Sequence, residues 1–376
     1  MVDPRPVLLI SHSFGYGGDL MYFGELFAAL RERLTHPLAI GVDAGVDYAN
    51  PYHLDLRRLF RRYELALGGH GYDRRISLVS PLLAARVARL RPAALVTIEF
   101  TPVALTATLG SLAVKDCGRV LLVESDPAPR GGSNAAPVRA VKNWAAARAD
   151  VVQTNNAAGR DYLLKDLGVA ADKIRVAPYM TSRPPGPGSP LTTDGPLRLL
   201  FVNSLTERKD AGTLLDALAL LPPDIAGQVE LDVVGDGPMR GRLVAQAVPL
   251  ESSTRFHGAR SYSDLGPFFA ASHALVNPTR ADYRSLSSFE GLGYGLALLI
   301  SRADGAHGET VLEGETGFTF TPGDAPTLAR QIERLARDRA LLARMRQASL
   351  RLYETRYALD LAAGNIAASI ERALER

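Results

Sequence analysis

Short apolar runs alternate with longer segments of helical periodicity through both halves of this sequence. Runs that are apolar throughout and separated by helices are typical of parallel strands, which helices cover on both faces of the sheet. The pattern therefore predicts doubly wound α/β domains. The predicted strands are 7–11, 38–42, 95–100, 120–124, 151–154 and 174–178 in the first half, and 197–202, 231–235, 255–258, 274–277 and 297–301 in the second.

This alternation breaks off at TSRPPGPGSPLTTDGP, residues 181–196. Prolines and glycines at this density favour neither a helix nor a central strand, so the segment is predicted to be a linker. The chain has 376 residues, more than one hydrophobic core usually supports. We therefore expect two domains, 1–180 and 197–358, and a C-terminal helix at 359–376 as the segment that packs back on the first domain.

The bulk composition is that of an ordinary globular protein, with 47% hydrophobic and 22% charged residues and a formal net charge of +3. Cys117 is the only cysteine, so neither an intramolecular disulfide nor a multi-cysteine metal site can form. The first apolar run is too short for the core of a signal peptide, and no run of about 18 apolar residues occurs. We therefore expect a cytoplasmic protein without a membrane span.

Sequence motifs for metals and nucleic acids are missing. The seven histidines are scattered, without H-E-x-x-H spacing, and no Asp-x-Asp triplet occurs. The small net charge and the lack of a base-reading motif argue against nucleic acid as a partner. We therefore expect no metal ion and no cofactor, and side chains and helix amides must supply the positive charge at any anion site.

The stretch LRRLFRRYELAL, residues 56–67, sets four arginines among leucines and aromatic residues. It resembles an amphipathic helix lying on anionic lipid, which would place the protein peripherally at the inner face of a membrane. A basic, solvent-exposed helix near the acceptor side is the alternative, and both interpretations stay open here.

Two carboxylates eight positions apart flank a group of serines in TRADYRSLSSFEGLGYG, residues 279–295. Ser285 is placed to cap a helix that follows an apolar strand. Ser287 and Glu290, three apart, then share one face of that helix, where Glu290 looks into the cleft, and amides at the helix start can bind a diphosphate. With Asp282 before the helix, the spacing suits a ligand that has sugars on both sides of a diphosphate.

Two more loops that follow predicted strands have unusual composition. In FVNSLTERKDAGTLLDAL, Lys209 opens a helix, where a cation opposes the helix dipole and so indicates an anionic partner. In VVGDGPMRGRL, Gly235 and Gly237 flank Asp236 and favour a tight turn over ligand contacts. Loops at the carboxyl ends of parallel strands meet at one edge of a sheet, so we expect these residues near the acid pair.

The acid pair and its surroundings resemble the acid-x7-acid signature of retaining GT-B glycosyltransferases, most closely glycosyltransferase family 4. The resemblance continues through the two loops above, through FHGARSYSDLGPFFAASHALVNPTR and through EGLGYGLALLISRADGAHGETVLEGETGFTFTPGDAPTLARQI. FGYGGDLMYFGELFAALRERL and ADVVQTNNAAGRDYLLKDLGVAADKIRVAPY extend it, more loosely, to the first half. It implies the GT-B fold, in which two Rossmann-like domains face a central cleft.

The resemblance also implies roles for individual residues. Glu290 would bind the nucleotide ribose and Asp282 a hydroxyl of the donor sugar, while Lys209 and the amides of Leu286 and Ser287 would hold the diphosphate. Further donor contacts are implied for Gly17, Gly18, Ser204, Arg208, Gly235, Gly258, Arg284 and Ser285. Candidates for the reaction itself are Asp282, Lys209, Glu99, Ser125 and Asp126.

Several positions in the second half depart from that family's usual pattern. Asp282 stands where glutamate is usual, and Ser285 where glycine is usual. Ser204 stands where an arginine normally joins the lysine on the diphosphate. The arginines available to compensate are Arg208, Arg280 and Arg284.

Two positions in the first half depart as well. Ser125, in VLLVESDP, falls where many relatives have a cleft histidine, and Glu99, in VTIEFTP, likewise replaces a frequent histidine. Glu124 and Asp126 thereby become candidates for donor or acceptor contacts.

The resemblance implies transfer of a sugar, with retention of the anomeric configuration, from a UDP- or GDP-linked donor. The acceptor would be a hydroxyl of a glycan, a glycolipid or a small molecule. The second domain would bind the donor and the first the acceptor. Two alternatives stay open: a nucleotide-sugar epimerase or hydrolase of the same fold, and a non-catalytic protein that binds nucleotide sugars.

Overall fold

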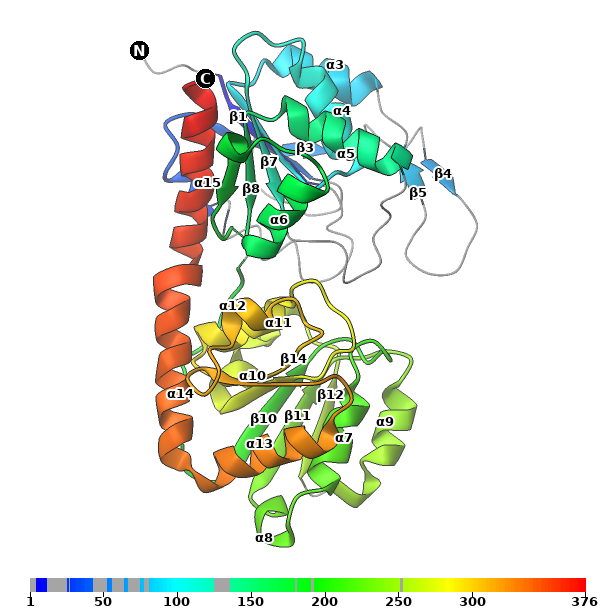
Figure 1. The fold of residues 1–376 in the computed structure, drawn as a ribbon, viewed down its shortest axis with the longest axis vertical. Helices are drawn as coiled ribbons and strands as arrows, with labels where there is room; N and C mark the ends of the chain where they lie inside the picture. The colour runs from blue at the N-terminus through cyan, green and yellow to red at the C-terminus, as the bar shows by residue number, and fades with distance from the viewer. Residues whose placement is uncertain are drawn as a thin grey trace. The chain divides into compact units, whose positions relative to one another are not determined.

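The computed structural model describes residues 5–11, 26, 28–42, 53–55, 64–66, 75–77, 81–124, 136–179, 181–190, 193–250 and 253–376. The chain forms two compact units (Figure 1). The first contains the described residues up to 179 together with Leu359–Arg376, and the second contains Thr181–Ala358. Each unit is built on a parallel sheet with helices on both faces, which confirms the predicted fold class.

The first unit contains a seven-stranded parallel sheet in the order β3-β2-β1-β6-β7-β8-β9. Its strands are β1 (Val7–Ser11), β2 (Leu38–Val42), β3 (His53–Asp55), β6 (Ala94–Ile98), β7 (Gly118–Val123), β8 (Val151–Thr154) and β9 (Ile174–Val176). The strand order reverses between β1 and β6, as in doubly wound folds. Three predicted strands, 95–100, 120–124 and 174–178, end earlier in the structure, and β3 has no counterpart in the predicted set.

Side chains of β1 point alternately to the two faces of this sheet, as the period of a strand requires. Val7 and Leu9 pack in a core with α15 (Leu359–Leu374), whereas Leu8 and Ile10 pack in a core with α3 and α4 on the opposite face. The helices on that opposite face are α3 (Pro81–Leu90), α4 (Pro102–Ser111), α5 (Ala136–Arg148) and α6 (Ala157–Lys165). A short 3₁₀ helix, Ala171–Lys173, precedes β9.

A small hairpin corrects one prediction for the first unit. Glu64–Ala66 (β4) pairs antiparallel with Arg75–Ser77 (β5), so the predicted helix over 56–67 is wrong at its C-terminal end. The remainder of that helix, and the lipid contact expected of it, lie outside the described residues. Among the helices that the structure describes, none is long and apolar enough to cross a bilayer.

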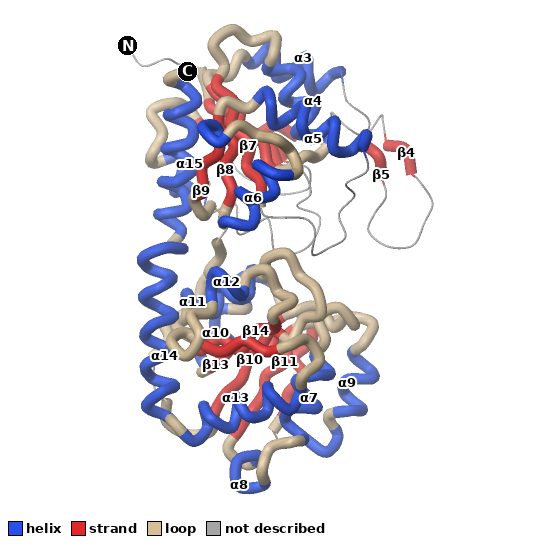
Figure 2. The backbone as a smooth tube through the Cα atoms, in the orientation of Figure 1, coloured by secondary structure: helices blue, strands red, loops and turns tan. Residues whose placement is uncertain are grey.

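The second unit contains a six-stranded parallel sheet in the order β12-β11-β10-β13-β14-β15 (Figure 2). Its strands are β10 (Leu197–Val202), β11 (Val229–Val234), β12 (Thr254–Gly258), β13 (Ala274–Asn277), β14 (Ala297–Ser301) and β15 (Gly317–Phe320). The five predicted strands are present with small shifts at their ends, and β15 is additional. Here the order reverses between β10 and β13, and such a switch point is where doubly wound sheets bind ligands.

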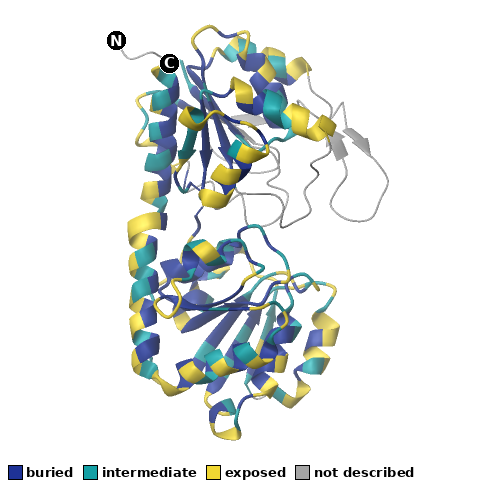
Figure 3. Ribbon diagram, in the orientation of Figure 1, coloured by how far each residue is buried: buried dark blue, intermediate teal, exposed yellow. Residues whose placement is uncertain are grey.

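Helices cover both faces of the second sheet, and their outer sides are exposed while the strands are buried (Figure 3). One face packs on α7 (Ala211–Ala219), α8 (Pro223–Ala226), α9 (Arg240–Gln246), α13 (Ala325–Arg337) and the start of α14 (Arg339–Leu352). The other packs on α10 (Gly266–Ala271), α11 (Leu286–Gly293) and a π-helical turn at Tyr353–Tyr357. Short helical turns lie at Val248–Leu250, Tyr262–Asp264 and His307–Thr310 (α12).

Candidate functional site

Two asparagines lie at the switch point of the second sheet. Asn277 ends β13 and Asn203 follows β10, and Asn203 Nδ2 donates to Asn277 Oδ1 at 2.9 Å. Asn277 Nδ2 lies 3.0 Å from each of the hydroxyl oxygens of Ser285, Ser287 and Ser288. This polar cluster fixes the start of α11 against both strands. Neither asparagine was in the predicted site, although a polar residue at the end of an apolar strand is a signal that the sequence contains.

Ser285 is the N-cap residue of α11, as the sequence predicts, with an extended backbone (φ −67°, ψ 126°). Its hydroxyl makes no capping bond to a backbone amide of the helix; it lies 2.9 Å from the Ser288 hydroxyl and donates to Asp304 Oδ2, and the Ser285 amide donates to Asp304 Oδ1 at 3.2 Å. The amide of Ala306 donates to the same carboxylate at 2.9 Å. Burial raises the pKa of Asp304, while the hydrogen bond from Ser285 lowers it. Asp304, which the sequence did not single out, therefore holds the capping residue in place.

The first amides of α11 are available to a ligand. Helices leave their first amides without intrahelical partners, and in the part of the chain that the structure describes the amides of Leu286 and Ser287 donate no hydrogen bond. The partial positive charge of a helix N-terminus is concentrated on such groups. The structure thus presents two donors where the resemblance expects a diphosphate.

Lys209 lies in the loop after β10 and is 8% exposed. Its Nζ is 2.5 Å from Asp282 Oδ2, and Arg208 Nη1 approaches the same oxygen at 3.1 Å. Asp282 precedes the helix cap by three residues, and its amide donates to Ala303 O at 3.0 Å. The structure therefore brings together two predicted cations and the first acid of the predicted pair.

Ser204, which stands in place of the usual arginine, and the arginines predicted to replace that arginine differ in their surroundings. Ser204 is exposed in the loop after β10. Arg280 forms an ion pair with Asp210, with Nε 2.9 Å from Oδ2. Arg208 is thus the arginine that accompanies Lys209.

Arg284 has a structural role that the sequence did not reveal. Its Nε and Nη2 donate to the two carboxylate oxygens of Glu309 at 2.9 and 3.0 Å, and the guanidinium lies 3.8 Å from the centre of the Phe289 ring. The Arg284 side chain is 0% exposed. A guanidinium buried in this way reaches a diphosphate only by breaking the pair with Glu309, so a donor contact of Arg284 stays a prediction.

Arg284→Met is expected to lower the free energy of unfolding by about 3–5 kcal/mol, because it takes both guanidinium bonds from a buried carboxylate. Arg337 provides the control: it pairs with Glu333 at 2.8 Å on the exposed side of α13, and Arg337→Met should change stability little. Urea unfolding of both variants makes the comparison, and equal losses would contradict the structural role of Arg284.

Glu290 lies in α11 and is only 5% exposed. Ser182 Oγ donates to Glu290 Oε1 at 2.9 Å and also forms a short hydrogen bond with the Tyr262 hydroxyl. Burial raises the pKa of Glu290 to about 7, against the hydrogen bond from Ser182, which lowers it. The sequence pattern has this carboxylate look into the cleft; in the structure it is buried beside Ser182, which Tyr262 contacts in turn, and its contact with a ligand stays a prediction.

The glycines of the neighbouring loop are required by close backbone packing. A Cβ on Gly235 (φ +144°) would lie 1.9 Å from the Asn203 carbonyl oxygen, and one on Gly237 (φ +158°) would lie 2.5 Å from that of Leu205. Gly258 has φ +71°, and its carbonyl accepts from the Gly235 amide at 2.9 Å. These contacts agree with the tight-turn interpretation, and a contact of Gly235 or Gly258 with a ligand stays a prediction.

Glu99 follows β6 in the first unit and has a left-handed backbone (φ +58°), which is uncommon for a non-glycine residue. Its Oε1 accepts from the Glu124 amide, after β7, at 2.6 Å. The Glu124 carbonyl accepts from Asn155 Nδ2, after β8, at 3.0 Å. A hydrogen-bonded row thus joins three strand ends, and Asn155 is a further residue that the sequence did not single out. Gly17, Gly18, Ser125 and Asp126 lie outside the described residues.

Together, the two doubly wound units define a GT-B fold. Residues 196–338 match the family described as Glycosyl transferases group 1. Glycogen synthase of Mycobacterium tuberculosis is 26% identical over 229 residues, which are 58% of this chain and 53% of that protein. An exopolysaccharide phosphotransferase of Streptomyces coelicolor is 29% identical over 195 residues, 49% of this chain and 19% of that one. The chain thus aligns with about half the length of the first relative and a fifth of the second.

Solved structures agree with this fold over nearly the whole chain. Anabaena HepE, determined in complex with UDP, superposes with a TM-score of 0.72 and 18% identity, covering 97% of this chain and 99% of HepE. Sucrose-phosphate synthase from Thermosynechococcus elongatus gives 0.70 and 18%, with 97% and 98% covered. WaaG, a glycosyltransferase involved in lipopolysaccharide biosynthesis, gives 0.67 and 14%, with 97% and 99% covered.

Proposed function

We propose that the chain is a retaining, metal-independent glycosyltransferase that moves a sugar from a nucleotide diphosphate sugar to an acceptor hydroxyl. One observation carries the proposal: Lys209 and Arg208 share the carboxylate of Asp282 at the switch point of the second sheet, next to a helix whose first two amides are available. The family match over 196–338 and the UDP bound by HepE favour a nucleotide donor.

The diphosphate of the donor would bind at the start of α11. Its oxygens accept from the amides of Leu286 and Ser287, and Lys209 exchanges its bond to Asp282 for a bond to phosphate. Asp282 is then available to accept a hydrogen bond from a hydroxyl of the donor sugar. Lys209 thus exchanges Asp282 for a phosphate oxygen, and Asp282 exchanges Lys209 for a sugar hydroxyl. Neither charge is left buried without a partner.

In the transfer step, the bond between the anomeric carbon and the diphosphate oxygen breaks while the acceptor oxygen bonds to the same carbon on the same face. The acceptor proton passes to an oxygen of the leaving diphosphate, so no side chain needs to act as nucleophile. Negative charge grows on the diphosphate as the bond breaks, and the α11 amides with Lys209 and Arg208 stabilise it. One such donor is worth roughly 3 kcal/mol of barrier.

The ribose hydroxyls would bind the carboxylate of Glu290, which the resemblance assigns to them. Acceptor contacts fall to the first unit, where Glu99 and Glu124 lie at adjacent strand ends and Ser125 and Asp126 follow in the chain. We propose a glycan, a glycolipid or a small-molecule hydroxyl as the acceptor class.

A panel of UDP-, GDP-, ADP- and CDP-linked sugars tests the proposal by thermal shift and by product analysis, with and without acceptors. We expect one nucleotide class to raise the melting temperature and to be consumed only when an acceptor is present. Consumption without acceptor would instead indicate a hydrolase or epimerase. Binding without turnover across the acceptors would indicate a non-catalytic binder, and no binding at all would remove the donor site.

A further inference from the structure

Three arginines gather at the amino-terminal edge of the second sheet, at the opposite ends of the strands from the proposed donor site. Arg198 is the second residue of β10, and Arg339 and Arg346 belong to α14. Arg339 Nη2 donates to the carbonyl of Gly195 at 2.7 Å, just before β10, and Arg346 Nε donates to that of Gly295 at 3.0 Å, just before β14. Because parallel strands begin at one edge, these contacts bring both α14 residues to the edge that contains Arg198.

His273, directly before β13, completes the cluster and is fully buried. The Arg198 amide donates to His273 Nδ1 at 3.1 Å, and Arg198 Nη2 lies 3.2 Å from Nε2. Burial, followed by the charges of Arg198, Arg346 and Arg339, lowers the pKa of His273 to about 3, so the ring is neutral at pH 7. A neutral imidazole has one acceptor nitrogen, so one of the two Arg198 donors meets no acceptor on the ring.

The positive charges of Arg198 and Arg339 are not balanced by ion pairs with described acids. Among the described residues, no carboxylate forms an ion pair with Arg198 or Arg339, and Arg339 Nη1 is buried without a hydrogen-bond acceptor. Asp338, the neighbour of Arg339, is engaged in capping α14 through the Leu341 amide at 2.8 Å. Burial and the charge of Arg198 lower the pKa of Arg346 to about 10. A buried donor without an acceptor destabilises the folded state, and an entering acceptor removes that cost.

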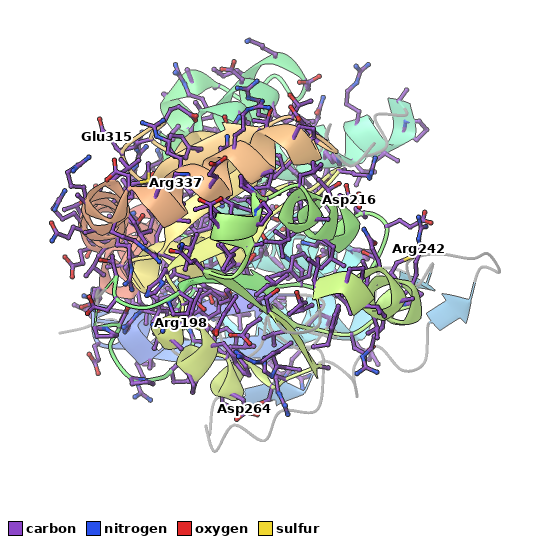
Figure 4. All side chains as sticks on the ribbon, turned by 90° about the horizontal axis from the view of Figure 1, so that it is seen from below. Arg198, Asp216, Arg242, Asp264, Glu315 and Arg337 are labelled. Carbon is purple, nitrogen blue, oxygen red and sulfur yellow. The ribbon has the colours of Figure 1, made fainter. Side chains whose placement is uncertain are left out.

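We propose that this edge binds a phosphate group, carried either by inorganic phosphate or by a phosphate ester. A tetrahedral oxyanion offers several acceptor oxygens, enough for Arg339 Nη1 and the remaining Arg198 donor together, and guanidinium groups match phosphate in a two-point geometry. Arg198, labelled in Figure 4, is only partly buried, so a ligand can approach its side chain from solvent. Arg346, already bonded to Ser189 at 2.6 Å, adds positive charge to the cluster.

Bound phosphate would join parts of the second unit that are distant in the chain. Arg339 ties the start of α14 to Gly195, and Arg198 ties β10 to His273 before β13. An anion that binds both arginines adds a link between these elements in the folded state only, so binding must raise the melting temperature. The sequence alone gives no sign of this cluster, because its members are separated by up to 148 positions and are brought together by the sheet.

Thermal unfolding in about 0.1 to 10 mM sodium phosphate tests the site, and sodium chloride of equal ionic strength is the control. The measurements use Lys209→Ala, in which the proposed donor site has lost its ammonium group. We expect phosphate, but not chloride, to raise the melting temperature by roughly 2–8 °C at saturation. Added Arg198→Gln or Arg339→Gln should abolish the rise. Arg344→Gln, an exposed arginine on the same helix, should retain it.

Two further arms make the result decisive. In the first, a hexose phosphate replaces inorganic phosphate. A rise in melting temperature with both ligands assigns the site to phosphate esters, and a rise with inorganic phosphate alone assigns it to the free ion. If Arg339→Gln does not fold, calorimetric titration of phosphate into the surface variant Arg198→Gln still decides the question. If chloride raises the melting temperature equally, or if the rise with phosphate persists in Arg198→Gln, the phosphate site is wrong. Neither result bears on the proposed donor site.

Discussion

Lys209→Ala will lower the rate of sugar transfer by roughly 100- to 1,000-fold, the loss seen when one preorganised donor is removed from developing negative charge. Lys209 is the buried ammonium of the proposed donor site and lies 2.5 Å from Asp282. Its charge matters most when the diphosphate leaves, so kcat should fall more than the donor KM rises. Steady-state kinetics with the donor identified by thermal shift provide the measurement.

A matched control separates loss of the ammonium group from a change in net charge. Arg242→Ala removes a cation from the exposed side of α9 in the same unit and should change kcat by less than about threefold. Similar losses in the two variants would show that Lys209 acts only through the overall charge.

A second control separates chemistry from folding. Lys209→Ala removes one of the two cations on a buried carboxylate, which itself destabilises the fold. The double variant Lys209→Ala/Asp282→Asn removes that carboxylate charge, so it should regain stability in urea unfolding while transfer stays low. Recovery of transfer in the double variant would mean that Lys209 serves the fold and not the reaction.

The fold was predictable because its signals are local. Apolar strands such as β10 and β13 are visible as continuous runs, and the proline-rich segment 181–196 before β10 marks where the pattern is interrupted. β15 was missed because its four residues lie between glycine and proline and resemble a loop. Strand ends were missed by one or two residues where a single residue such as Glu99 turns out of the strand.

The site was predictable only in part, because side-chain partners are set by tertiary contacts. Loop position after β10 and β13 was enough to bring Lys209 and Asp282 together, since parallel strands end at one edge. Nothing local indicates that Arg284 pairs with Glu309, 25 positions away, or that Ser182 meets Glu290, 108 positions away. A charged residue next to a motif is therefore a weak guide to its partner until the fold is known.

These contacts also explain how the site is held in place. Asn277 and Asp304 bind the serines at the start of α11, and the Arg284–Glu309 pair fixes the loop before it. The amides of Leu286 and Ser287 are thereby fixed before any ligand arrives. Catalysis by electrostatic stabilisation depends on such preorganisation, because donors that are already oriented need not be reorganised during the reaction.

Glu290→Gln will remove a pH dependence of stability that the unmodified protein should show. Burial raises the pKa of Glu290 to about 7 in the folded chain, against an ordinary value of 4.5. Between these two values the folded state holds a proton that the unfolded state has released. The stabilisation from this proton is therefore complete below pH 4.5 and is lost as the pH rises through 7, and at 1.36 kcal/mol per pKa unit the loss approaches about 3 kcal/mol.

Urea unfolding at several pH values from about 5 to 8 measures this difference. The free energy of unfolding of the unmodified protein should fall relative to Glu290→Gln, which keeps the shape of the side chain but cannot ionise. Ser182→Ala removes the hydrogen bond that lowers the folded-state pKa, so its fall should start at the same pH but continue to higher pH. Glu333→Gln, which alters a partly exposed carboxylate on α13, should follow the unmodified protein. Curves for Glu290→Gln and Glu333→Gln that run parallel across this range would show that Glu290 ionises normally in the folded chain.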